Sequence, residues 1–310
     1  MPDDRPGGRQ IRPETGQEGR AQVSLDRVAG APISWGVCEV PGWGYQLSPE
    51  RVLHEMAALG IKATELGPEG FLPADARAAA AVLEASGISA VGGFNPVLLH
   101  DPSHDPVGGL KATLDLYEAL PAQVVVLAAV TGLDGYDTRP VLDDDGWRLL
   151  LDNLERAAGL VRDRGLVAAL HPHVGTMVER PDEVARVLDG SSVPLCLDTG
   201  HLLIGGSDPV ELVRRAPERV AHVHLKDVDA TLAAEVTAGS LTYTEAVAQG
   251  MYRALGQGDV DIATIVRTLE AHGYQGWYVL EQDTVLGTEP ADEGPVAAVR
   301  ASYSYVAGLL

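Results

Sequence analysis

The feature that most constrains this chain is a repeated alternation of short apolar segments with longer segments of helical periodicity, from about residue 30 onward. Short aliphatic runs predict buried strands, and apolar residues spaced three and four apart predict amphipathic helices. Eight candidate strands are each followed by a helical stretch: Ala31–Val37, Ala63–Leu66, Ala90–Phe94, Val124–Ala128, Val167–His171, Pro194–Asp198, His222–Leu225 and Trp277–Glu281. This α/β pattern predicts a closed (β/α)₈ TIM barrel, although a doubly wound open sheet shares the alternation.

The chain is expected to form a single catalytic domain, the barrel of residues 28–310, after a flexible N-terminal tail of residues 1–27. The tail is rich in Gly, Pro and charged residues, a composition that buries too little apolar surface to offset the entropy of ordering. Barrels of this class often exceed 250 residues as one domain, so 310 residues require no second domain.

Several helix ends can be predicted from local signals. Ser48 before Pro49, and Asp208 before Pro209, match the preference for a capping side chain followed by proline at the first helical position. Glycines just past a helical pattern indicate helix ends, because glycine adopts the left-handed conformation without strain. These glycines are Gly60, Gly87, Gly165 and Gly273.

One connection is much longer than the others. About 30 residues, roughly Val228 to Gly258, separate the seventh predicted strand from its helix. Loops that follow barrel strands lie on the face where active sites form. We expect this segment to contain helix over Ala230–Gly250 and to form a lid or wall of the site.

The charge excludes some partners. The chain has 23 Lys and Arg against 44 Asp and Glu, for a formal charge of −21, which disfavours nucleic acid and anionic membranes. No apolar stretch reaches the length of a membrane span, and the N-terminus lacks the apolar segment of a signal peptide. Only two cysteines occur, Cys38 and Cys196, which fits a reducing compartment. A cytoplasmic location is therefore expected.

Polar residues stand at the C-terminal ends of five predicted strands, where a buried carboxylate or imidazole is costly unless it is paired or ligates a metal. In a barrel these ends converge. The mixed imidazole and carboxylate set suits Mn²⁺, Co²⁺, Fe²⁺ or Zn²⁺ better than Mg²⁺ or Ca²⁺. The five ends are Thr64-Glu65-Leu66-Gly67, Leu170-His171-Pro172-His173, Leu195-Cys196-Leu197-Asp198-Thr199-Gly200-His201, Ala221-His222-Val223-His224-Leu225-Lys226-Asp227 and Val279-Leu280-Glu281-Gln282-Asp283.

Each of these residues alone has an ordinary explanation. A single histidine in an apolar run is more often a hydrogen-bonded core residue than a ligand, and Asp198 before Thr-Gly is also a helix cap. Polar ends on several neighbouring strands are together improbable by accident and favour a metal site. Residues two apart share a face of a strand, so His224 lies one step closer to the strand end than His222, which is expected in the core. His201 is placed to contact substrate or to orient Asp198.

These motifs resemble the xylose isomerase-like barrel superfamily from Ala31 to about residue 285. The superfamily elements are Leu197-Asp198-Thr199-Gly200-His201 and His222-Val223-His224-Leu225-Lys226-Asp227. Within the superfamily, His171-Pro172-His173-Val174-Gly175-Thr176 resembles the inosose dehydratase family. The resemblance implies a metal held by Asp198, His224 and Glu281, and by a fifth-strand residue that is glutamate in related ketose epimerases. Here His171 takes that place, with His173 as the competing assignment.

The resemblance implies a metal-dependent lyase that eliminates water from a keto-cyclitol such as 2-keto-myo-inositol, with Mn²⁺ or Co²⁺ preferred and Zn²⁺, Fe²⁺ or Mg²⁺ as alternatives. The epimerases use two opposed glutamates, so a histidine in place of one favours elimination over epimerisation. The candidates for proton transfer are Glu281, Lys226, His173 and Glu65, without a ranking of the base. The alternative within this class is a metal-dependent keto-sugar isomerase or epimerase.

Other residues are expected around the substrate. His201, Trp35 and Arg253 are candidate substrate contacts, and Trp43, Tyr45 and Phe94 are candidates for an apolar wall, although core packing explains the aromatic residues nearly as well. An abasic-site endonuclease needs a basic groove, which the charge contradicts. A non-catalytic sugar-binding module would not need ligands from four strands. The superfamily often forms homo-oligomers through barrel helices.

Overall fold

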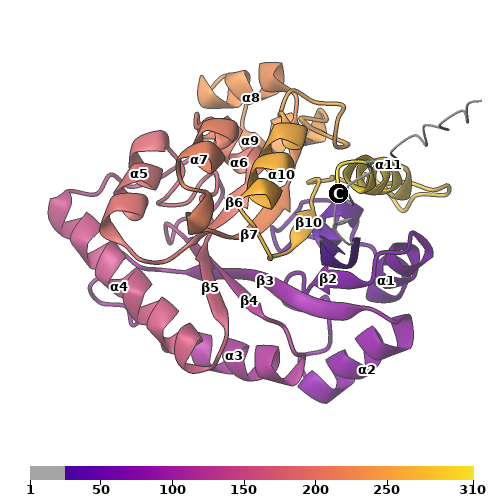
Figure 1. The fold of residues 1–310 in the computed structure, drawn as a ribbon, viewed down its shortest axis with the longest axis horizontal. Helices are drawn as coiled ribbons and strands as arrows, with labels where there is room; N and C mark the ends of the chain where they lie inside the picture. The colour runs from indigo at the N-terminus through magenta and orange to yellow at the C-terminus, as the bar shows by residue number, and fades with distance from the viewer. Residues whose placement is uncertain (1–24) are drawn as a thin grey trace, which may run out of the picture.

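The computed structural model of the chain describes residues 25–310 and shows a closed barrel of eight parallel strands surrounded by helices (Figure 1). The predicted TIM barrel is thus confirmed, and the open sheet is excluded. Neighbours around the barrel are, in order, β1 (Val28–Gly30), β10 (Tyr278–Leu280), β7 (Val220–Leu225), β6 (Leu195–Asp198), β5 (Val167–Leu170), β4 (Val124–Ala129), β3 (Ser89–Val97) and β2 (Ala63–Glu65), which closes on β1.

Helices connect consecutive strands and cover the outside of the barrel (Figure 1). The main apolar core lies between strands and helices, while smaller clusters such as Ala29, Ala63 and Val279 belong to the opposite face of the strands. The helices are α1 (Pro49–Ala58), α2 (Ala76–Ser86), α3 (Leu110–Ala119), α4 (Asp144–Asp163), α5 (Pro181–Gly190), α6 (Thr199–Ile204), α7 (Pro209–Arg215), α8 (Ala230–Thr237), α9 (Tyr243–Ala248), α10 (Ile262–Ala271) and α11 (Val296–Ala307).

The first strand was predicted in the wrong place. Instead of Ala31–Val37, the strand is Val28–Gly30, and Pro32–Trp35 forms a 3₁₀ helix. Pro32 has no N–H for a strand ladder and is favoured at the start of a helix. Gly36, with φ of 81°, then ends the short helix. The first and last residues of the other strands agree with the predicted ones to within a few positions.

The predicted helix ends are confirmed. Ser48 accepts a hydrogen bond from the backbone N–H of Arg51 at the start of α1, and Asp208 caps α7 in the same way. Gly87 ends α2 with φ of 65°, and the other three predicted glycines also have positive φ. These signals are local, which is why they can be recognised without knowledge of the tertiary fold.

The N-terminal tail predicted for residues 1–27 lies outside the described residues except for Leu25–Arg27, which form a 3₁₀ helix. The guanidinium of Arg27 pairs with Glu270 at 2.8 Å and donates to the backbone carbonyl of Tyr274. Arg27 therefore attaches the segment before β1 to α10.

The long connection after β7 is structured, as expected. It contains a two-stranded antiparallel sheet, β8 (Asp227–Val228) with β9 (Tyr252–Arg253), and between them the helices α8 and α9. Asp227, fully buried, accepts hydrogen bonds from the backbone N–H groups of Gly256, Gly258, Val228 and Val260 at 2.8–3.1 Å. This carboxylate joins both ends of the connection.

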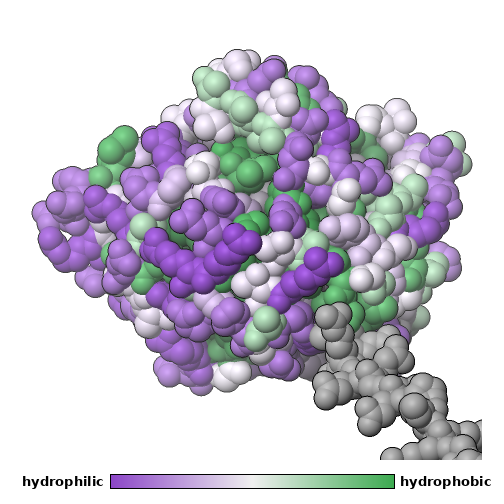
Figure 2. Space-filling view, turned by 45° about the horizontal axis from the view of Figure 1, so that its top comes forward, coloured by the Kyte–Doolittle hydropathy of each residue, from purple (hydrophilic) through white to green (hydrophobic). Residues whose placement is uncertain are grey.

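Hydrophilic residues cover most of the face shown in Figure 2, with hydrophobic residues interspersed among them. Within residues 25–310, no helix has the length and apolarity needed to cross a bilayer.

Candidate metal centre and cavity

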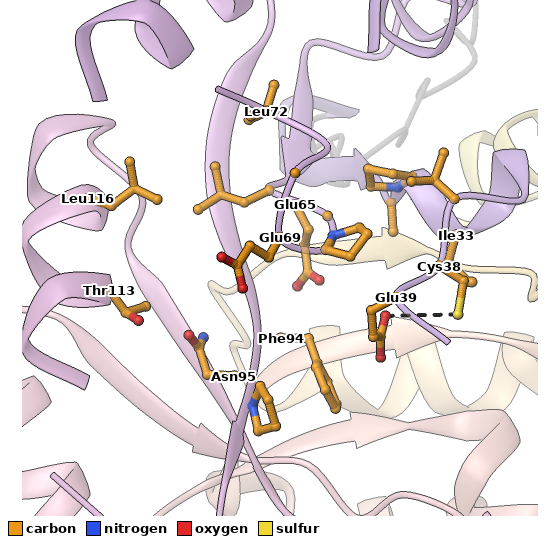
Figure 3. A pocket seen from close by; sticks show the side chains of 18 of the residues that line it. Ile33, Cys38, Glu39, Glu65, Glu69, Leu72, Phe94, Asn95, Thr113 and Leu116 are labelled. Atoms are coloured by element: carbon orange, nitrogen blue, oxygen red, sulfur yellow. Dashed lines mark hydrogen bonds between the residues drawn. The ribbon is translucent and has the colours of Figure 1, made fainter. Parts of the chain in front are cut away.

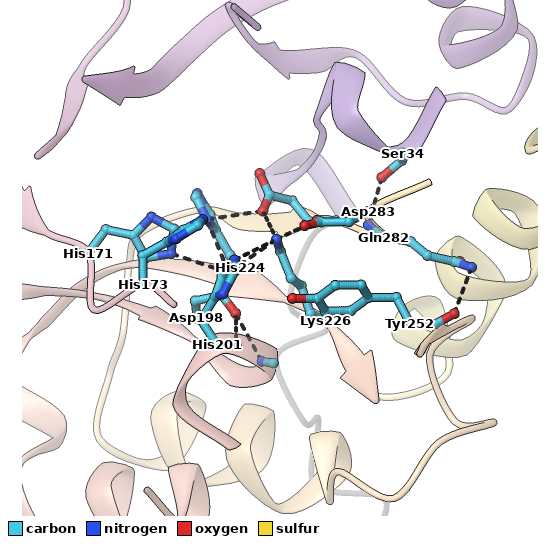
Figure 4. A network of polar contacts seen from close by, with 12 residues as sticks. Ser34, His171, His173, Asp198, His201, His224, Lys226, Tyr252, Gln282 and Asp283 are labelled. Atoms are coloured by element: carbon cyan, nitrogen blue, oxygen red, sulfur yellow. Dashed lines mark hydrogen bonds and ion pairs between the residues drawn. The ribbon is translucent and has the colours of Figure 1, made fainter. Parts of the chain in front are cut away.

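Four side chains from neighbouring strands converge at the C-terminal end of the barrel, and Figure 4 labels His171, Asp198 and His224 among them. His171 follows β5, Asp198 ends β6, His224 lies in β7 and Glu281 follows β10. Asp198 Oδ2 is 3.3 Å from His171 Nε2 and 3.6 Å from His224 Nδ1. Parallel pairing sets Asp198 directly beside His224, which explains why residues far apart in sequence meet here. All four are at most 9% exposed.

The donor atoms of this cluster fit a divalent cation. His224 Nδ1 is buried, makes no hydrogen bond to any described residue, and faces Asp198 Oδ2 and Glu281 Oε2, the latter at 3.2 Å. The ligand atoms of Asp198, His224 and Glu281 all lie within 4.8 Å of one another. One imidazole nitrogen and two carboxylate oxygens form a donor set typical of Zn²⁺, Mn²⁺ or Co²⁺. His171 borders the same group through Asp198.

The other atoms of these ligands are held by the protein. Glu65 Oε1 lies 3.0 Å from His224 Nε2 and 2.8 Å from His222 Nε2, so it orients the His224 ring. His222 is fully buried, as expected for a core residue. Asp198 Oδ1 accepts from the backbone N–H groups of Gly200 and His201, which leaves Oδ2 for the cluster. Asp198 is therefore both the helix cap and a member of the cluster.

The electrostatics of the cluster follow from burial and charge. Burial opposes an imidazolium, yet the acidic groups of Cys196, Glu281 and Glu65 raise the pKa of His224 well above its usual range. Burial also opposes the Glu65 carboxylate, yet His224 and His222 hold the pKa of that carboxyl below its usual range. The two groups therefore stabilise each other's charged forms.

Lys226 lies beside the cluster and is 3% exposed. Its ammonium is 3.2 Å from Glu281 Oε2 and 3.7 Å from Asp198 Oδ2, and it donates to Asp283 Oδ1 at 2.5 Å. It is also 3.1 Å from His201 Nε2, which must accept because an ammonium has only donors. The structure thus brings this predicted residue next to the cluster.

The rings of His173 and His201 are in contact, with centroids 3.6 Å apart and planes tilted by 32°. Burial lowers the pKa of both rings well below 6.5, so both are neutral at physiological pH. His173 Nδ1 is 2.7 Å from the carbonyl oxygen of Val174 and therefore carries the proton, which leaves an unprotonated Nε2. His173 lines the cavity, whereas His201 lies behind it, between His173 and Lys226.

Two predicted substrate contacts lie elsewhere. Trp35 is fully buried against α1, where its indole N–H donates to Glu55 at 2.8 Å, and it does not line the cavity. The displaced first strand explains the error, because the 3₁₀ helix turns this ring into the core. Arg253 is an exposed residue of β9 whose guanidinium pairs with Asp229 at 3.0 Å, away from the cavity lining.

His171, His224 and Glu281 of the cluster line a cavity of about 750 Å³, part of whose wall is drawn in Figure 3. Phe94 and Trp43 contribute apolar wall, as expected, whereas Tyr45 is exposed and lies outside the lining. Lys226 is the only lysine or arginine among the described residues that line the cavity. The carboxylates that line it are Glu39, Glu65, Glu69, Glu281 and Asp283.

Sequence reasoning gave no role to two residues that support the site, Asp283 and Tyr243. Asp283 lies two positions after Glu281, on the same side of the chain, and this spacing was a usable signal. Tyr243, in α9, donates to Asp283 at 2.6 Å and lies 2.9 Å from the hydroxyl of Tyr252 in β9. Because both tyrosines come from the long connection, their place could not be derived from strand periodicity.

Comparison with known proteins agrees with this geometry. The family model described as the xylose isomerase-like TIM barrel matches residues 53–302. The inosose dehydratase of Geobacillus kaustophilus strain HTA426 is 32% identical over 297 residues, which cover 92% of this chain and 94% of that relative. The chain belongs to the xylose isomerase-like TIM barrel family. Because its curated relatives are named as enzymes, we conclude that this chain is also an enzyme.

Solved structures with low sequence identity share the fold. The IolI protein, in a structure with a bound zinc atom, aligns with a TM-score of 0.66 at 14% identity over 91% of this chain and 97% of that one. The probable 3-DHS dehydratase AsbF of Bacillus anthracis aligns with a TM-score of 0.66 at 13% identity over 90% and 98%. At such identities the similarity shows the barrel alone.

Proposed function

We propose that this chain is a divalent-metal-dependent dehydratase that removes water from an uncharged keto-cyclitol such as 2-keto-myo-inositol. The curated relative at 32% identity is named inosose dehydratase, and it aligns over nearly the full length of both chains. The named activity would use a metal, a base and an acid near one cavity, and candidates for each among the described residues support the proposal.

The observation that carries elimination over epimerisation is the identity of the residue that follows β5. His171 stands there, where the resemblance to ketose epimerases predicts a glutamate. Burial lowers the pKa of His171, so its ring is neutral and lacks the negative charge of the glutamate that it replaces. Elimination needs no symmetrical exchange of protons between two carboxylates, whereas two-face epimerisation does.

His171, Asp198, His224 and Glu281 would hold the cation, and a cation there would polarise the ketone of the substrate and offset negative charge on its oxygen. The charges of the cavity support an uncharged substrate. Five carboxylates line it, and its single ammonium, Lys226, is already paired with Asp283 and Glu281. A sugar phosphate would meet net repulsion here.

His173 is the base that the geometry favours. Its Nε2 is unprotonated, since the carbonyl of Val174 holds the proton on Nδ1, and the ring lines the cavity. A neutral imidazole accepts a proton from the carbon beside a ketone. Lys226, whose ammonium lies 3.2 Å from Glu281 Oε2 and which lines the cavity, is the candidate acid for the departing hydroxyl.

Incubation of the purified protein with 2-keto-myo-inositol and Mn²⁺ or Co²⁺ tests the proposal. Mass spectrometry should show loss of one water, together with a new ultraviolet-absorbing product. An isomer of unchanged mass would identify an epimerase or isomerase instead, and an unchanged substrate would contradict both.

The variant His173→Asn tests the base. We expect turnover to fall on the order of a hundredfold or more, while metal content stays at the wild-type value. His104→Asn is a matched control, because His104 is exposed and does not line the cavity. If His173→Asn turned over substrate at the wild-type rate, His173 would not be the base.

A further inference from the structure

Lys226 occupies an unusual position for a lysine. The ammonium of a flexible four-carbon side chain is 3% exposed at the end of a cavity, within 4 Å of three carboxylates. A buried ammonium is stable only with well-placed partners, and a flexible side chain loses rotamer entropy when it is fixed. The position of this ammonium must therefore be set by groups around it.

Asp283 is the residue that makes the shortest contact with it. Asp283 Oδ1 accepts from Lys226 Nζ at 2.5 Å, closer than Glu281 or Asp198. Asp283 is 8% exposed, and its carboxylate is not a member of the candidate metal site formed by Asp198, His224 and Glu281. Its carboxylate is thus available to hold the ammonium rather than a cation.

The second oxygen of Asp283 is held by the long connection after β7. Tyr243 of α9 donates to Asp283 Oδ2 at 2.6 Å, and the hydroxyl of Tyr243 lies 2.9 Å from that of Tyr252. The Tyr252 ring lies under the ammonium, with Nζ 5.1 Å from its centroid. Figure 4 shows Lys226, Tyr252 and Asp283 side by side.

The contacts form a continuous chain from the connection to the reaction centre. Tyr243 fixes one oxygen of Asp283, Asp283 fixes the ammonium with the other, and the ammonium lies 3.2 Å from Glu281. Each hydroxyl or ammonium donor in the chain has a charged acceptor, which makes such bonds short and directional. A shift of α9 would therefore be transmitted to Lys226.

We propose that Asp283 and Tyr243 are positioning residues that set the Lys226 ammonium at the reaction centre and make its place depend on the connection between β7 and α10. The effect on turnover rests on the proposed dehydratase function. The effect on the ammonium itself does not, and it can be measured without substrate.

The chain suits a direct measurement of this ammonium. Its only lysines are Lys62, Lys111 and Lys226, and the first two are exposed. In protein labelled with ¹⁵N on lysine, we expect one ammonium correlation protected from exchange with water at neutral pH, assigned by its loss in Lys226→Met. Asp283→Asn should abolish or shift this signal, and Tyr243→Phe should shift it.

Kinetics provide the second readout. We expect Asp283→Asn to lower kcat on the order of tenfold or more, and Tyr243→Phe to lower it by a few fold, with KM within about twofold of wild type. Tyr303→Phe, a half-buried tyrosine of α11, is the matched control and should leave signal and kcat unchanged.

The two readouts separate the inference from the proposed function. If the wild-type protein does not dehydrate the keto-cyclitol, the ammonium signal alone decides the inference. Tyr243→Phe keeps the packing of the ring, so it decides the question even if Asp283→Asn fails to fold. A Lys226 signal that is unchanged in folded variants of both residues would overturn the proposal.

Discussion

His224 Nδ1 lies 3.2 Å from Glu281 Oε2, although the whole long connection and α10 separate the two residues in sequence. The contact arises because β7 and β10 are neighbours in the barrel, paired so that His224 lies beside Val279. Glu281 lies two residues further along the chain, one step nearer the strand end than His224, and its side chain reaches the His224 ring from there. The cluster is therefore a consequence of barrel register.

Removal of single members of the cluster should remove the metal. We expect Asp198→Asn and His224→Ala to lose most bound Mn²⁺ or Co²⁺ and to lower turnover by at least a hundredfold. Elemental analysis of purified variants measures the metal. Asp198→Asn keeps an oxygen to accept from Gly200 and His201, so the helix cap survives. Asp208→Asn, which alters only the cap of α7, is the control; full metal content in Asp198→Asn would contradict the assignment.

The Asp227 carboxylate should stabilise the fold rather than bind metal. It accepts four backbone N–H bonds from both ends of the long connection, and a Cβ on Gly258 would collide with it. We expect Asp227→Ala to lower the free energy of unfolding by about 2–4 kcal/mol, because buried donors lose a charged acceptor. Urea unfolding measures the change. Asp134 is exposed, so Asp134→Asn should change the free energy of unfolding little. An equal loss of stability in both variants would contradict the role assigned to Asp227.

Trp35 should matter for stability and not for substrate affinity. Its buried indole fills the space beside α1 and donates to Glu55. We expect Trp35→Phe to lower the free energy of unfolding by about 1–3 kcal/mol while KM stays within twofold. Thermal or urea unfolding and steady-state kinetics measure the two effects. A raised KM in a variant as stable as the wild type would instead support the prediction from sequence that Trp35 contacts the substrate.

Glu155 should lose its stabilising role in acid. Partial burial opposes its charge, but hydrogen bonds from the backbone and hydroxyl of Ser192 and from the hydroxyl of Ser191 lower its pKa. A carboxylate whose pKa is lower in the folded state stabilises the fold above the unfolded pKa of about 4.3, and loses this effect as pH falls through the folded value. Urea unfolding of Glu155→Gln should therefore differ from wild type at pH 7 and approach it in acid. A difference that grew in acid would contradict this sign.

The sequence predicted the barrel because its signals are periodic and repeated. Strand spacing, the caps of α1 and α7 and the helix-ending glycines depend on near neighbours alone. The first strand was misplaced because the apolar run that contains Pro32 has the composition of a strand. Pro32 cannot donate a backbone hydrogen bond to a sheet, and the run forms a 3₁₀ helix. Short runs of this kind carry no periodicity that separates a strand from a 3₁₀ turn.

The sequence predicted the site residues at strand ends better than those in loops. Residues at strand ends, such as Asp198 and His224, follow from barrel geometry, because parallel strands bring their ends together. Tyr243 lies in a helix of the long connection, and Arg253 lies outside the cavity lining, and neither position follows from strand order. Loop conformation depends on tertiary contacts such as those of Asp227, which local sequence does not reveal.

The most direct test is a metal titration of the stripped protein. Protein treated with a chelator should be inactive towards 2-keto-myo-inositol, and added Mn²⁺ or Co²⁺ should restore loss of water in proportion to metal bound, up to one ion per chain. Asp198→Asn should recover neither. Full dehydration by the metal-free protein, or by Asp198→Asn without bound metal, would contradict the account.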